Sequence, residues 1–156
     1  MNGSCVATTS VDEFLAGARP GLERALIARF GLRDGLDAAA DAVEYAVANW
    51  DRLRTMENPT GYLFTVGRTR ATRAARRADR LTALVAEPTT TDSPVDVDLQ
   101  RALMGLPWEE RVAVMLVHAH GHTYARAAEI MDLPVTSITN HLNRGLTRLR
   151  KEVGER

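Results

Sequence analysis

Apolar residues recur along most of the chain at intervals of three and four, which is the helical period, and no stretch shows the alternation typical of strands. In the first half this pattern predicts helices over residues 11–30, 37–56 and 59–81. In the second half it predicts shorter helices over residues 95–104, 108–119, 123–131 and 136–153. The breaks at "GLP", "HGH" and "DLP" contain Gly or Pro, which end or redirect helices. We therefore expect an all-α protein.

One stretch without apolar period divides these helices into two groups. Residues 86–93, "AEPTTTDS", are rich in Pro and Thr, as is typical of a linker. The sequence thus predicts two small helical domains, residues 1–81 and 95–156, joined by a linker over residues 82–94. Because the linker has little apolar surface, the two domains should dock on one another, if they do, through the apolar faces beside it. Such docking would hide the basic surfaces in the free protein.

Charge is distributed unevenly although the formal net charge is zero. Residues 59–81 carry six arginines against a single acid, and residues 135–156 carry five basic residues against two acids. Between them, residues 82–110 carry one arginine against six acids. Two basic segments separated by an acidic one are compatible with an anionic partner. Arginine supplies 19 of the 20 basic residues, and it is the cation better suited to bidentate contacts with phosphates and base edges.

Other features of the sequence exclude several classes of protein. A single cysteine, Cys5, provides no disulfide framework and no cysteine metal site, which suits a reducing compartment. No apolar run is long enough for a membrane span, and the first residues do not resemble a signal peptide. We expect a soluble cytoplasmic protein with no membrane contact.

The last two predicted helices carry the strongest functional signal. Thr123 can cap a short helix, "MDLPV" makes a tight turn, and the final helix places Ile138, Leu142, Leu146, Leu149 and Val153 on one face. Short amide, hydroxyl and basic side chains gather on the opposite face and at its edges: Thr136, Thr139, Asn140, Asn143, Arg144, Thr147, Arg148 and Lys151. A purely solvated face would more commonly hold Glu, Lys and Gln. The pattern therefore favours a helix-turn-helix whose second helix reads the major groove.

These residues carry a family resemblance. The segment from "LPWEERVAVML" to "LNRGLTRLRKEV" resembles region 4 of the extracytoplasmic-function (ECF) sigma factors. The matching positions are Leu106, Pro107, Arg111, Tyr124, Ala128, Pro134, Ile138, Leu142, Arg144 and Leu149. The match covers about a third of the chain. In this family, region 4 reads the minus 35 promoter element.

Residues 11–80 resemble region 2 of the same family more faintly. Asp41 and Val43 fit its "AEDxxQ" stretch, and "NPTGYLFTVGRTRATRAARR" is similar to its "P-x-x-W-L-x-x-I-A-R-N" helix. Four positions depart from the pattern: Glu44 stands where Gln is usual, Tyr62 replaces Trp, Thr69 replaces Asn, and Arg73 replaces an acid. In such proteins, region 2 binds a coiled coil of the polymerase large subunit and melts the minus 10 element.

The resemblance implies that the chain binds RNA polymerase core and promoter DNA, and an anti-sigma factor is a further candidate partner. The candidate polymerase contacts are Asp41, Val43, Glu44, Val47 and Trp50. The candidate DNA contacts are Arg68, Arg70, Arg73, Arg76 and Arg77 in the third helix, and Thr136, Ser137, Thr139, Asn140, His141, Asn143, Arg144, Arg148 and Lys151 in the last. Thr139 and His141 replace residues that are commonly basic, which predicts fewer phosphate contacts.

Several other features are more simply structural. His118, His120 and His122 span a helix end and a Gly turn rather than a metal-ligand spacing, so we expect no metal and no cofactor. Glu109 and Glu110 lie in the first turn of a helix, where negative charge offsets the helix dipole. Because no nucleophile triad or phosphate loop is present, we expect no enzymatic activity.

Two other functions remain open. The first is a DNA-binding regulator that keeps the helix-turn-helix but does not bind polymerase core. The second is a helical interaction module, for which the zero net charge is the only support. Binding to core polymerase distinguishes a sigma factor from the DNA-binding regulator. DNA binding that falls steeply with salt distinguishes both of these from the helical interaction module.

Overall fold

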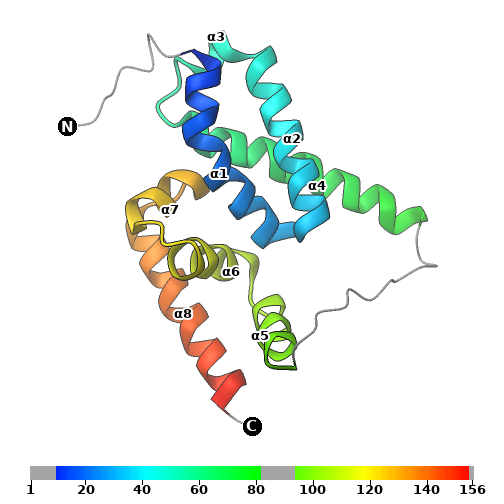
Figure 1. The fold of residues 1–156 in the computed structure, drawn as a ribbon, viewed down its shortest axis with the longest axis vertical. Coiled ribbons are helices and arrows are strands. Elements are labelled where there is room, and N and C mark those ends of the chain that lie inside the picture. The colour runs from blue at the N-terminus through cyan, green and yellow to red at the C-terminus, as the bar shows by residue number, and fades with distance from the viewer. Residues whose placement is uncertain (1–9, 82–93, 155–156) are drawn as a thin grey trace.

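The computed structural model describes residues 10–81 and 94–154, and every regular element in these ranges is helical. The first group contains α1 (Val11–Phe30), α2 (Leu32–Ala48), α3 (Trp50–Leu53) and α4 (Pro59–Leu81). The second contains α5 (Pro94–Met104), α6 (Trp108–Val114), the π-helical turn η2 (Met115–Ala119), α7 (Tyr124–Met131) and α8 (Val135–Gly154). Figure 1 shows α1, α2 and α4 packed together, with α6, α7 and α8 beneath them. The all-α prediction and the C-terminal helix-turn-helix are confirmed.

The second helix differs from its prediction, which was residues 37–56. It begins at Leu32, because only Gly31 separates it from α1, and Gly31 has a φ of 90°, which favours glycine. Gly35 is buried inside α2, where a side chain would collide with the α1 backbone at Ile27. The helix ends at Asn49, whose Nδ2 donates to the Tyr45 carbonyl over 3.0 Å, and a short α3 follows.

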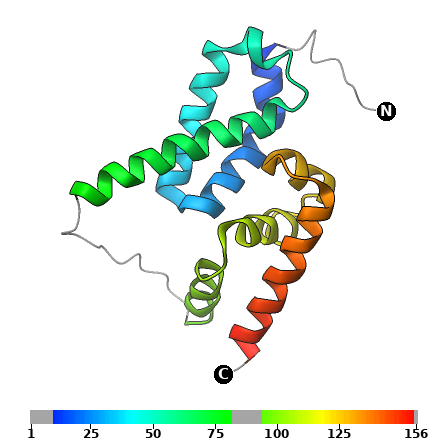
Figure 2. The same ribbon diagram turned by 180° about the vertical axis from the view of Figure 1, so that it is seen from behind.

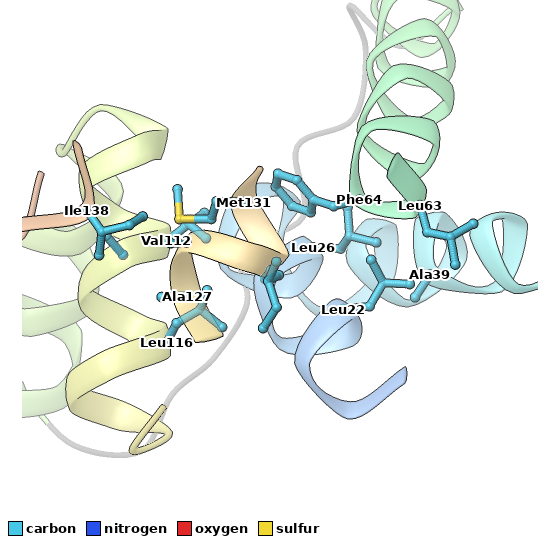
Figure 3. Packing of buried hydrophobic residues seen from close by; sticks show 14 of the residues in the cluster. Leu22, Leu26, Ala39, Leu63, Phe64, Val112, Leu116, Ala127, Met131 and Ile138 are labelled. Atoms are coloured by element: carbon cyan, nitrogen blue, oxygen red, sulfur yellow. The ribbon is translucent and has the colours of Figure 1, made fainter. Parts of the chain in front are cut away.

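The two groups of helices share a continuous hydrophobic cluster. Leu22, Leu26, Leu63 and Phe64 fill the first group, while Val112, Leu116, Ala127 and Ile138 fill the second (Figure 3). Gly21 of α1 makes the approach of α7 possible, because a β-carbon there would lie 2.7 Å from Ile130 Cδ1. Apolar packing thus continues across the boundary between the groups.

Arg111 of α6 is the main polar anchor between the groups. It is buried, with 7% of its surface exposed, and its guanidinium donates to two carbonyls near the end of α1: Nε to Ala28 over 2.7 Å and Nη2 to Arg29 over 3.1 Å. Its Nη1 also donates to the carbonyls of Met104 and Leu106, over 3.3 and 3.1 Å. The side chain therefore satisfies the orphan carbonyls at the end of one helix and the turn before another.

A second polar contact joins the turn of the helix-turn-helix to the segment before α4. Asn58 Nδ2 donates to the Glu129 carbonyl over 2.8 Å and lies 3.2 Å from Asp132 Oδ1. Arg126 Nη2 donates to the carbonyl of Gly17 in α1 over 3.1 Å. Two long-range side-chain contacts therefore hold α7 against the first group of helices.

Candidate nucleic-acid interface

The helix-turn-helix is built by local capping. The Thr123 hydroxyl accepts a hydrogen bond from the Arg126 backbone N–H over 3.1 Å and so caps α7, as the sequence predicts. Asp132 ends α7 in the left-handed region, with φ 53° and ψ 47°. The Leu133 N–H then donates to the Ala128 carbonyl over 3.0 Å. This short turn fixes the angle at which α8 leaves α7.

Helix α8 has two distinct faces. Ile138, Leu142 and Leu149 are buried on the face that packs on α5, α6 and α7. Buried Gly145 allows a close approach of α6, because a β-carbon there would lie 3.0 Å from Val114 Cγ2. Val153, which the pattern placed on the apolar face, is instead 56% exposed. The helix extends away from the first group of helices (Figure 2), so docking does not cover its outer surface.

The predicted reading residues divide into exposed and half-buried positions. Ser137, Thr139 and His141 are half-buried. The outward side presents the exposed residues Thr136, Asn140, Asn143, Arg144, Thr147, Arg148 and Lys151. The hydroxyls of Thr139 and Thr147 donate to the carbonyls four residues earlier, over 3.1 and 2.7 Å, which explains how threonine is accommodated inside the helix. Amide and guanidinium groups therefore dominate the exposed face.

Arg148 also has a partner within the protein. Its Nη1 lies 3.4 Å from Oε2 of the buried Glu110 in α6, but the geometry is not that of a hydrogen bond, so Oε2 has no donor among the described residues. The Arg148 side chain is 54% exposed, which leaves most of the guanidinium accessible. Arg148 can thus neutralise Glu110 and still reach a phosphate.

The basic residues of α4 differ in their interactions within the protein. The Arg68 guanidinium carbon lies 5.1 Å from the ring centroid of Trp108, and Arg70 Nη1 donates to the Asp41 carbonyl over 3.2 Å. Arg73, Arg76 and Arg77 are exposed. Only the last three of the five predicted contacts are therefore both exposed and without a side-chain interaction in the described part of the chain. The prediction that docking hides the basic surfaces is wrong for α8 and for these three arginines, because the groups join through apolar side chains and backbone carbonyls.

The candidate polymerase contacts on α2 and α3 differ in how far they are exposed. Glu44 and Val47 are exposed, Val47 to 59%, whereas Asp41 and Val43 are half-buried. Trp50, the first residue of α3, packs on the Phe14 ring at a centroid distance of 5.1 Å, which indicates a structural role. Sequence reasoning missed Leu32 and Leu36, which are 67% and 43% exposed on the same helix. Their spacing of four residues was the available signal.

The histidine cluster contains a contact between the two groups of helices. Arg24 Nη1 of α1 lies 3.3 Å from His122 Nε2. Burial first, and then the charge of Arg24, lower the pKa values of His120 and His122 below the usual histidine range. No group of three metal-ligating side chains occurs in the described ranges, and no helix there is long and apolar enough to cross a membrane.

Comparisons with known proteins bear on the family. Residues 96–149 match the family model for sigma-70, region 4. The fold is similar to that of the sigma factor RpoE from Bartonella quintana, solved as a co-crystal with the anti-sigma factor NepR. The TM-score is 0.62 at 23% sequence identity, over 92% of this chain and 96% of that one. The chain therefore has the fold of this sigma factor, and residues 96–149 form a sigma-70 region 4 domain. The resemblance to region 4 drawn from the sequence is confirmed, and region 4 includes the helix-turn-helix of α7 and α8.

Proposed function

We propose that this protein is a cytoplasmic sigma factor that binds RNA polymerase core and directs promoter-specific initiation of transcription. The observation that carries the proposal is the exposed face of α8, where Asn140, Asn143 and Arg144 project from a region 4 helix-turn-helix. Asparagine can pair with adenine through two hydrogen bonds, and arginine can pair likewise with guanine. The protein then acts by binding and positioning rather than by catalysis.

The proposed organisation has a region 2-like domain in residues 1–81, a linker over residues 82–94 and region 4 in residues 95–156. Linker residues 82–93 lie outside the described residues. In this organisation α2 provides the polymerase contact, which the exposure of Leu36, Glu44 and Val47 supports. Arg73, Arg76 and Arg77 provide phosphate contacts beside the melted element.

An anti-sigma factor is a further proposed partner. The sigma factor RpoE, whose fold is similar, was crystallised with the anti-sigma factor NepR, and this chain and RpoE match over nearly their whole lengths. This support rests on fold alone. Co-purification of the tagged protein from its native cells, followed by identification of a stoichiometric small partner, tests it.

Core binding tests the main proposal. We expect the purified protein to bind RNA polymerase core and to give run-off transcripts on a genomic promoter library. Val47→Asp should weaken core binding about tenfold or more, because docking would desolvate the added carboxylate without a partner. Ala16→Asp adds the same charge at an exposed position of α1 and should bind core as the wild type does.

DNA binding without core binding would support the alternative function, a regulator with a sigma-like helix-turn-helix. The engagement of Arg68 and Arg70 within the protein favours that alternative, because it weakens the case for DNA contacts by region 2. Core binding that is equally sensitive to Val47→Asp and Ala16→Asp would exclude α2 as the polymerase contact.

A further inference from the structure

A hollow lined by arginines lies where α1, α4 and α6 meet. Arg29 comes from α1, Arg68, Arg73 and Arg76 come from α4, and Trp108 begins α6. The hollow therefore has walls from both groups of helices. Sequence reasoning missed Arg29, because it lies about 40 residues before the basic part of α4 and on a different helix.

Trp108 contacts two of these arginines through its ring. The guanidinium carbons of Arg29 and Arg68 lie 4.8 and 5.1 Å from the Trp108 ring centroid. The guanidinium carbon of Arg29 also lies 5.0 Å from the Phe30 ring centroid, and that of Arg68 lies 6.0 Å from the Phe64 ring centroid. Aromatic faces attract the guanidinium planes but do not use their in-plane N–H donors. Those of the donors that reach the surface of the hollow remain available to a ligand.

No carboxylate in the described ranges lies within ion-pair distance of the arginines of the hollow. Arg29, Arg68, Arg73 and Arg76 form no ion pair with a carboxylate in the described ranges, and the buried Nε of Arg29 has no hydrogen-bond partner there. Burial, followed by the charges of Arg111 and Arg68, lowers the pKa of Arg29, while Glu109 acts in the opposite direction. An unpaired buried donor beside several like charges is costly unless an anion compensates it.

We propose that this arginine hollow binds a phosphate or diphosphate group in the free protein. Charge-assisted, bidentate N–H···O bonds from arginine match the geometry of phosphate oxygens. The anion would lie between α1 and α4 on one side and Trp108 of α6 on the other, so it would favour the docked arrangement of the two groups. Its source is either a small phosphorylated molecule or a nucleic-acid backbone. The proposal concerns the protein without DNA or polymerase and does not depend on the proposed function.

Binding is tested with pyrophosphate and the full-length protein. At about ten times its dissociation constant, pyrophosphate should raise the Tm by roughly 3–6 °C over sodium chloride of equal ionic strength. In the Trp50→Phe variant Trp108 is the single tryptophan, and its fluorescence should change on titration. Isothermal titration of the wild type gives the affinity without depending on that variant.

Matched double variants locate the site. Arg73→Gln with Arg76→Gln removes two exposed arginines of the hollow and should weaken pyrophosphate binding about tenfold or more. Arg33→Gln with Arg150→Gln removes the same charge at exposed positions elsewhere and should leave the affinity within twofold. Equal weakening by both pairs, or no Tm rise beyond that of sodium chloride, would overturn the proposal.

Competition identifies the source of the phosphate. A short oligothymidylate without terminal phosphates is added to the pyrophosphate complex. Displacement in the wild type shows that the hollow accepts a backbone phosphate. Retention of pyrophosphate shows that the site selects small phosphorylated molecules. Both results keep the anion site, because the double variants test its existence separately.

Discussion

Helices α4 and α8 both carry predicted DNA contacts, yet the fold leaves more of those on α8 free of interactions within the protein. Most of the predicted contacts on α8 lie on its exposed face, and Arg148 alone among its cations has an ion-pair partner in the described chain. On α4, Arg68 lies against Trp108 and Arg70 donates to the α2 backbone, while three exposed arginines have no side-chain interaction in the described chain. The proposed reading surface of α8 is thus exposed, whereas on α4 some of the basic residues are engaged within the protein.

The difference has a cause in the packing. One face of α8 packs on α5, α6 and α7, while the residues of the opposite face are exposed. Helix α4 packs on α1, α2 and α7, and Arg68 also meets the Trp108 ring of α6, so its arginines contact aromatic rings and carbonyls. DNA contacts by Arg68 and Arg70 would have to replace interactions within the protein, which reduces the net gain.

Arg111, which joins α6 to α1, should give the largest effect. Arg111→Ala should lower the free energy of unfolding by about 3 kcal/mol or more, because it leaves the carbonyls of Ala28, Arg29 and Leu106 without their donor. Arg111→Lys keeps the charge but not the planar set of five N–H donors, so its free energy of unfolding should lie between those of the wild type and Arg111→Ala. Urea denaturation measures the difference. A decrease below about 1 kcal/mol would mean that the apolar contacts alone hold the docked arrangement.

Substitutions on α8 should separate base reading from phosphate binding. Asn140→Ala and Asn143→Ala should each relax the preference at one or two promoter positions, by roughly 1–3 kcal/mol per base pair. Lys151→Ala should weaken binding to all sequences alike. Binding selections on a randomised minus 35 element measure both. Because the asparagines are exposed, the Tm should be unchanged. An unaltered preference in both asparagine variants would exclude this face as the reader.

The salt dependence of promoter binding should distinguish the arginines of α4 that are engaged within the protein from those that are not. Arg76→Ala with Arg77→Ala should reduce the slope of log K against log salt by about 0.9 for each DNA phosphate that the variant no longer neutralises. Arg70→Ala should change the slope less, because Arg70 already donates to the Asp41 carbonyl and lies over the Tyr45 ring. Titrations of promoter DNA between low and moderate salt measure the slopes. Equal changes in the two variants would remove the proposed distinction between free and engaged arginines.

The smallest expected effect concerns pH and the contact between Arg24 and His122. Because the folded protein lowers the pKa of His122, the unfolded chain binds the proton more readily. Stability should therefore be full above the ordinary histidine pKa of about 6.5 and decline as the pH falls below it. His122→Gln should reduce this decline when Tm is followed against pH. An identical profile would assign the dependence to His120 or to other groups.

Local sequence patterns predicted a large part of the fold and of the site. The helical period located most of the helices, and Thr123 marked the start of α7. The boundary at Leu32 was missed because a single left-handed glycine suffices to separate α1 from α2. The apolar spacing also identified the exposed face of α8, since one helix determines which of its residues share a face. Val153 shows the limit, because its exposure depends on whether another helix reaches it.

The sequence by itself determined the helices, the family resemblance and the reading face of α8, because each depends on residues close together in the chain. Only the tertiary structure decided which arginines are engaged and where the two groups of helices meet. Arg111 and the Ala28 carbonyl are 83 positions apart, and Arg24 and His122 are 98 apart. No local period encodes such pairs. They form only when the apolar faces of separate helices pack together and bring their polar side chains within hydrogen-bonding distance.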